Sequence, residues 1–164
     1  MLDSARQRVR QFREATARPT NADLTLARTY LDGTLLDLFQ GQEPRDVVHG
    51  VRTARWLLDR GHADRELLQA ALLHDVGKGN QRTRDRVAYV VAARMRLAGT
   101  LARRGTATRM AQAVGRSLRH SDVGAMLLEQ AGASPRVVAL TRLHHSEPGG
   151  DGMLALLQEA DAAS

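Results

Sequence analysis

Six histidines and no cysteine define the chemistry open to this chain of 164 residues. Without thiolates, a bound metal must be held by nitrogen and oxygen, and disulfides and cysteine nucleophiles are excluded. One histidine beside an apolar helix stripe is usually a hydrogen-bonded core residue. Several together are harder to explain in that way, because imidazole and carboxylate are the ligands that hold zinc, iron, manganese or nickel. The candidates at helix ends or on inward helix faces are His49, His74, His120, His144 and His145, with Asp161 as a further carboxylate.

The stretch "AALLHDVGKGN", residues 70–80, places the chain's only lysine just beyond a candidate helix end. An apolar helix leads into His74 and Asp75, and glycines then flank Lys78. An ammonium is a compact point charge, whereas a guanidinium is a broad planar fork, so a phosphate close to a metal has more room for lysine than for arginine. The stretch therefore points to a phosphate ligand beside a metal.

The elements that must position these groups are helices. Apolar residues recur every three or four positions and no alternating strand pattern is present, which predicts a single all-α domain with about eight helices. Glycines 77 and 79 are expected to end the fourth helix, a break is expected near His120, and Ser134 is expected to cap a helix with Pro135 in its first turn. The expected ranges are 4–18, 21 or 23–40, 46–60, 64–76, 84–98, 106–119, 122–131, 134–145 and 153–162.

Charge and composition restrict the partners. With 24 basic and 18 acidic residues, the net charge of +6 favours anionic small molecules such as phosphates over cationic ones. Nucleic acid is disfavoured, because the basic residues are scattered and an aromatic content of 3% leaves little on which bases can stack. No run of about 18 apolar residues occurs and the N-terminal segment is charged, so we expect no membrane span, no signal peptide and a cytoplasmic location.

The order of these groups, with the contexts "ALLHDVGKG" and "LLQEADAAS", resembles the HD superfamily of metal-dependent phosphohydrolases. The resemblance spans about residues 45–163, so we expect an HD domain over 45–164. Residues 1–44 have no counterpart in it and are expected to form helices that pack on the same core, with a cover over the site or a homodimer interface as alternatives. The resemblance implies four basic metal ligands: His49, His74, Asp75 and Asp161.

Two further segments imply a second ion. "RHSDVGAMLLEQAG" resembles the "HxxxGAxLL" element of members with paired metals, which assigns His120, and "VVALTRLHHSEPGG" resembles the element with the partner histidine, best matched by His144. Six ligands fit two divalent ions, drawn from manganese, iron, zinc, nickel and magnesium. The role of His145 stays open: it is either a metal ligand or a residue that supports the ligands or contacts substrate.

The resemblance also implies roles in catalysis. Asp75 would bridge the ions or take a proton from water, and Lys78 would stabilise charge on a substrate phosphate. Arg52 and Arg82 are candidate phosphate contacts, with a surface salt bridge and a solvated loop as their respective alternatives.

The plan is closest to small HD hydrolases of diadenosine tetraphosphate. The likeness to HD-GYP phosphodiesterases is partial, because Arg45 replaces their third-metal glutamate and "SEPGGDG" replaces the GYP signature. We expect a phosphohydrolase acting on a nucleotide or dinucleoside polyphosphate. The alternatives are a di-iron oxygenase of the same fold and a catalytically silent nucleotide-binding signalling module.

Overall fold

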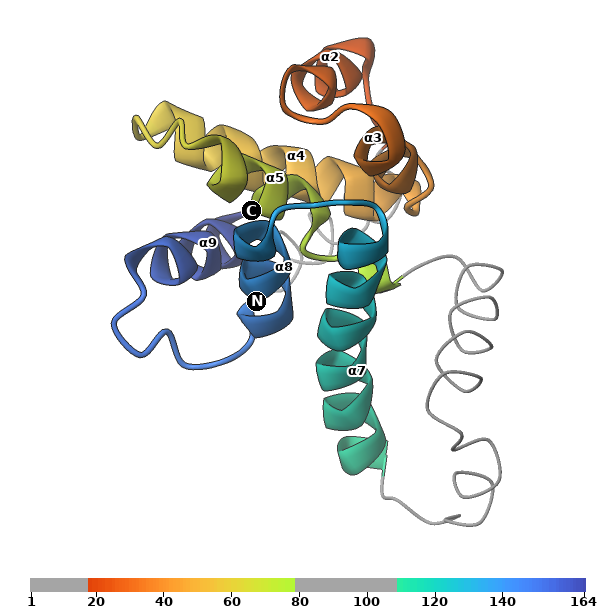
Figure 1. Cartoon of the computed structure of the whole chain (residues 1–164), viewed down its shortest axis with the longest axis vertical. Helices are drawn as coiled ribbons and strands as arrows, with labels where there is room; N and C mark the ends of the chain where they lie inside the picture. The colour runs from red at the N-terminus through yellow and green to blue at the C-terminus, as the bar shows by residue number, and fades with distance from the viewer. Residues whose placement is uncertain (1–17, 79–108) are drawn as a thin grey trace, which may run out of the picture.

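The computed structural model describes residues 18–78 and 109–164, and every regular element in those ranges is helical (Figure 1), which confirms the all-α prediction. The helix expected over 84–98, and nearly all of that expected over 4–18, lie outside the described residues. The elements are α2 (Asn21–Tyr30), α3 (Gly33–Gln40), α4 (Pro44–Asp59), α5 (Arg65–Leu73), the short 3-10 helix η1 (Val76–Lys78), α7 (Arg109–Gln130), α8 (Pro135–Leu143) and α9 (Gly152–Ala163). None of these helices is long and apolar enough to cross a bilayer.

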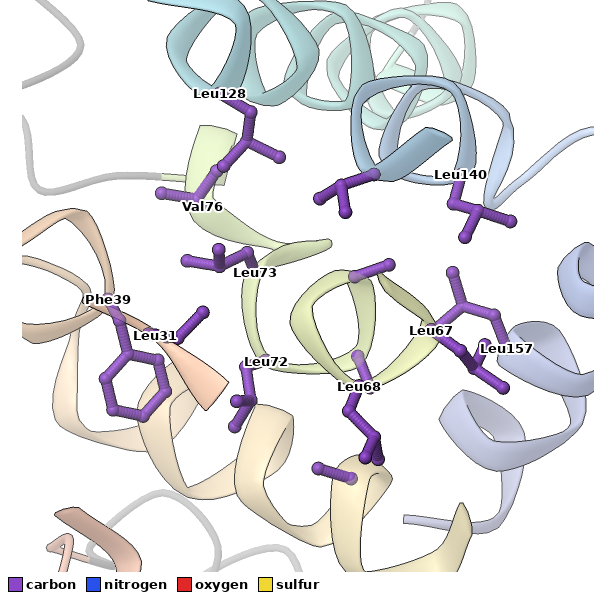
Figure 2. Packing of buried hydrophobic residues seen from close by; sticks show 14 of the residues in the cluster. Leu31, Phe39, Leu67, Leu68, Leu72, Leu73, Val76, Leu128, Leu140 and Leu157 are labelled. Atoms are coloured by element: carbon purple, nitrogen blue, oxygen red, sulfur yellow. The ribbon is translucent and has the colours of Figure 1, made fainter. Parts of the chain in front are cut away.

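Helix α5 is the central element. Every residue from Leu67 to Leu73 is buried, and α5 contacts α2, α3, α4, α8 and α9. A helix that is apolar on all sides is stable only when other elements surround it. Figure 2 shows the leucines of α5 directed to several sides of the helix, with Leu67 toward Leu157 of α9. The end of α5 is therefore delivered to the middle of the molecule.

Helix α2 lies against α4 and α5, and α3 lies against α5. Leu31 and Phe39 belong to the same hydrophobic core as the leucines of α5. An ion pair of 2.8 Å joins Arg55 of α4 to Asp23 of α2, and Asp23 also completes a capping box with Thr20 at the start of α2. Residues 21–40 thus share apolar packing with the helices that carry the candidate site.

The single helix expected from residue 21 or 23 to residue 40 is wrong, because the chain forms two helices there. Leu31 has extended backbone angles of φ −113° and ψ 140°, and its side chain is only 1% exposed. Asp32 then precedes α3 as its N-cap residue. Burial of Leu31 in the core overrides the continuous helical period that the sequence suggests.

Two expected helix ends also differ. The break near His120 is wrong, since α7 runs without interruption from Arg109 to Gln130. Helix α5 ends at Leu73, before Gly77, and η1 follows. Both η1 and α8 pack along α7, and this tertiary packing keeps the helix continuous through His120. In contrast, Ser134 caps α8 as expected by accepting a backbone hydrogen bond, and Asp64 does the same at the start of α5.

Candidate metal centre

The structure brings the predicted ligands together from five helices. His49 lies on α4, His120 on α7 and Asp161 on α9. Their candidate ligand atoms form two groups, and within each group these atoms lie within 4.8 Å of one another. We call His49, His74 and Asp161 the first triad, and His120, His144 and His145 the second triad.

The first triad joins α4, the end of α5 and the end of α9. His49 Nε2 lies 2.7 Å from Asp161 Oδ1, and His74 Nε2 lies 3.4 Å from the same oxygen. Two imidazole nitrogens and a carboxylate oxygen that meet in this way form a nitrogen and oxygen donor set suited to a divalent transition metal.

The second triad consists of imidazoles alone. His120 Nε2 lies 3.3 Å from His144 Nε2 and 3.3 Å from His145 Nε2. A neutral imidazole has one nitrogen that donates and one that accepts, so three ring nitrogens facing one another cannot all be satisfied by mutual hydrogen bonds. His145, which the sequence left open, therefore lies where a third ligand of this triad would lie.

Asp75 lies between the triads. Its Oδ2 atom is 3.6 Å from His74 Nε2 and 4.0 Å from His49 Nε2, on the side of the first triad. Its Oδ1 atom is 3.5 Å from His120 Nε2 and 3.9 Å from His144 Nε2, on the side of the second. One carboxylate thus directs one oxygen to each triad, which is the geometry of a bridging ligand.

Two histidines are oriented by the same kind of local hydrogen bond. His74 is the C-cap of α5 and His144 is the C-cap of α8. The Nδ1 of His74 lies 3.0 Å from the carbonyl oxygen of Ala71, and that of His144 lies 2.7 Å from the carbonyl oxygen of Thr141. With the proton on Nδ1 and donated to the carbonyl, each Nε2 keeps its lone pair and faces inward. In the sequence, each of these two histidines directly follows a leucine, in the pairs "LH" at residues 73–74 and 143–144.

The buried polar atoms test whether the residues fit a metal. His74 Nε2 and Asp75 Oδ1 are both buried and have no hydrogen-bond partner among the described residues. Each buried unsatisfied polar atom costs about 1–3 kcal/mol. A divalent ion held at each side of Asp75 would satisfy both atoms, so the donor set fits the metal ions that the sequence predicts.

The carboxylates of the site are ionised. Burial raises the pKa of Asp75, but the charges of His74 and Lys78 outweigh burial and hold this pKa well below its usual range. Burial likewise opposes ionisation of Asp161, and the hydrogen bond with His49 lowers the pKa of Asp161 below its usual range. Lys78 Nζ contacts Asp75 Oδ2 directly. The carboxylates of Asp75 and Asp161 therefore provide two negative charges that can bind cations.

The imidazoles differ in charge. Burial lowers the pKa of His144 to about 3, so this ring is neutral at physiological pH and its Nε2 can act as a ligand. Burial also disfavours the charged form of His74, but the neighbouring Asp75 and Asp161 carboxylates outweigh it and raise the pKa of His74. A metal at the first triad would therefore compete with a proton for Nε2 of His74.

Glycines beside the ligands allow close packing. Directly after His49, a Cβ on Gly50 would lie 2.8 Å from the carbonyl oxygen of Leu72 in α5. A Cβ on Gly77 would lie 1.9 Å from the carbonyl oxygen of His120 in α7. Only glycine permits these approaches of backbone to backbone, and they bring α4 against α5 and η1 against α7 at the site.

Other expected residues lie as follows. Arg52 is exposed on α4, three residues beyond His49. Arg82 lies outside the described residues. Asp46, which the sequence analysis missed, is buried one turn before His49, and burial is the main cause that raises the pKa of its carboxyl group. Its spacing of three residues from His49 was the available signal, since such residues share a helix face.

Fold and site together define a helical domain with a candidate metal centre of imidazole and carboxylate ligands. In comparison with known families, the HD domain matches residues 47–163, and the chain therefore belongs to the HD domain family. HD domains bind divalent metals and are mostly metal-dependent phosphohydrolases. No curated protein and no solved structure matches the chain.

Proposed function

We propose that this protein is a metal-dependent phosphohydrolase with two divalent ions, acting on a phosphate ester or anhydride of a nucleotide or dinucleoside polyphosphate. The observation that carries the proposal is the position of Asp75, whose two oxygens face two separate triads. A site with two metal ions stabilises both the attacking and the departing oxygen of a phosphate ester. A carboxylate between two ions, as proposed for Asp75, would hold them at the spacing that this chemistry requires.

The geometry supports a division of the proposed ligands between the two ions. His49, His74 and Asp161 would hold one ion, and the second triad would hold the other, with Asp75 shared. When bound, the ions supply Lewis acidity and lower the pKa of water. The three imidazoles of the second triad carry no negative charge, so Asp75 is the carboxylate that balances the charge of a cation there.

Asp75 and Lys78 have separate roles in the reaction. Because its pKa is held well below the usual range, Asp75 is a weak base, and we assign it the orientation of the attacking water rather than removal of its proton. The Lys78 side chain is 37% exposed while it contacts Asp75, so its ammonium lies at the surface of the site. It can hydrogen-bond a phosphoryl oxygen there and stabilise the charge that develops during the reaction.

The net charge of +6 supports an anionic substrate. Arg52, exposed on the same helix as His49, is a second cation that we assign to substrate phosphates. An oligophosphate substrate would use both cations, which is the reason for proposing a dinucleoside polyphosphate or nucleotide rather than a small monoester.

The test begins with metal content per chain, measured by elemental analysis of untagged protein. Phosphate or nucleotide release is then measured with a panel of nucleotides and dinucleoside polyphosphates. The double variant His74→Ala with Asp75→Ala should lose turnover and metal. His62→Ala is the matched control, because His62 lies in the turn after α4 and belongs to neither triad.

Each outcome has a meaning. Two equivalents of metal and turnover lost only in the double variant support the proposal. No metal and no uptake on reconstitution, with tight nucleotide binding, would instead favour a silent binding module. Iron with oxygen consumption on an organophosphonate or polyol, and no phosphate ester hydrolysis, would favour an oxygenase.

A further inference from the structure

Gln158 of α9 holds the backbone that follows α8. Its side-chain Nε2 donates to the carbonyl oxygen of His144 at 3.2 Å and to the carbonyl oxygen of Ser146 at 2.5 Å. These two carbonyls flank His145. The chain that carries two members of the second triad is therefore tied to α9 by one amide group.

The position of Gln158 on α9 makes this contact relevant to both triads. Gln158 precedes Asp161 by three residues, so both side chains lie on one face of the helix. Asp161 belongs to the first triad, with its Oδ1 atom 2.7 Å from His49 Nε2. One face of α9 thus contributes a candidate ligand to the first triad and a backbone clamp to the second.

The backbone from His144 to Ser146 lies outside any helix and depends on contacts with other elements for its conformation. Helix α8 ends at Leu143, and the last carbonyls of a helix have no partner within it. His145 and Ser146 are exposed, and the loop that follows continues to the start of α9 at Gly152. His144 is held through its own Nδ1 contact with Thr141. Within residues 18–78 and 109–164 no comparable backbone contact orients the His145 ring, whose Nε2 faces His120. The backbone path from His144 to Ser146 therefore sets the direction of that ring.

We propose that Gln158 is a positioning residue of the second triad: its amide fixes the backbone from His144 to Ser146 so that the imidazoles of His144 and His145 face His120. The inference rests on the proposed function, because it requires an ion at the second triad. Removal of the amide should weaken binding of one ion and leave the other, bound through His49, His74 and Asp161, unchanged. Mutation of a residue that orients metal ligands without binding the metal itself typically weakens metal affinity by about 10- to 100-fold.

The test compares Gln158→Met with Gln69→Met. Methionine keeps most of the side-chain length and removes the donor. Gln69 is the matched control, since its Nε2 also donates to a backbone carbonyl, that of Tyr30 at 2.9 Å, and it belongs to neither triad. Each metal-free protein is titrated with Zn²⁺ and with Mn²⁺ by calorimetry, and its melting temperature is measured without metal.

The expected result is two ions in the wild type and in Gln69→Met, with one of the two bound about 10- to 100-fold more weakly in Gln158→Met. Both variants should lose similar amounts of thermal stability without metal. Unchanged affinities in Gln158→Met, or equal weakening of both ions, would overturn the positioning role and leave the proposed function standing. A wild type that binds no second ion would overturn both. Gln158→Leu, which is also uncharged and lacks the donor, provides the same comparison if the methionine variant does not fold.

Discussion

Gly77→Ala should damage this protein more than its size suggests. A Cβ at residue 77 would lie 1.9 Å from the carbonyl oxygen of His120 and 2.5 Å from the backbone nitrogen of Gly124. Real Cβ contacts do not fall below 3.0 Å, so η1 and α7 would have to separate by about 1 Å. Both obstructing atoms are backbone atoms of one helix and cannot rotate away as a side chain can.

The magnitude follows from that displacement. Overpacking of a well-packed interior costs about 1–3 kcal/mol, and we expect about 3 kcal/mol here because the backbone itself must move. The same movement separates Asp75, which lies two residues before Gly77, from His120, now 3.5 Å away. A displacement of about 1 Å in an active site can cost about 100-fold, so metal affinity should fall together with stability.

The assay is urea unfolding of the metal-free protein, followed by calorimetric titration with Zn²⁺. Gly152→Ala is the matched control, because a Cβ on Gly152, the first residue of α9, would meet nothing within 4 Å. This control should unfold at the same urea concentration as the wild type or slightly higher, since alanine favours helix over glycine. If Gly77→Ala matched the wild type in both stability and metal binding, the close contact of η1 with α7 would be refuted.

Three further predictions concern the carboxylates. Asp75→Asn should weaken both ions, because each oxygen faces one triad; elemental analysis that shows one ion fully retained would contradict a bridging role. Deletion of Asp161 to Ser164 should lower metal content and affinity, because it removes a ligand of the first triad; unchanged metal content would remove Asp161 from the ligand set. The hydrogen bond from Arg136 lowers the pKa of Asp151 from 3.8 to about 2, so this pair stabilises the fold above about pH 4 and its contribution is lost as the pH falls toward 2. Asp151→Asn should therefore show a smaller drop in melting temperature between those two pH values, and a drop equal to that of the wild type would count against the ion pair.

Much of the helical architecture is predictable because helical periodicity is local. The start of α8 at Ser134 follows from capping chemistry within four residues, and the structure confirms this cap and the start of α5 next to Asp64. The same local reasoning failed at Leu31 and at His120. In both places the helix is interrupted or continued by packing against residues distant in sequence, which no local pattern contains.

The candidate site divides in the same way. Residue types alone limit the ligands to imidazole and carboxylate, because the chain has six histidines and no cysteine. Motif order also identifies His74, Asp75 and Asp161 as members of one site. The role of Gly77 as a close-contact residue was not predictable, since its spacing near a helix end equally suits a terminator.

By itself, the sequence determined the helical class of the fold and the donor atoms available to a metal, because side-chain chemistry and periodicity belong to the chain before it folds. Tertiary structure alone decided that the oxygens of Asp75 face different triads and that the ring of His145 lies beside that of His120. It also decided that Gln158 hydrogen-bonds the backbone from His144 to Ser146. Asp75 and His120 lie 45 positions apart in the sequence, His145 and His120 lie 25 apart, and Gln158 and Ser146 lie 12 apart. Their geometry arises only when α4, α5, α7, α8 and α9 pack around one core, so it cannot be derived from any single stretch of the chain.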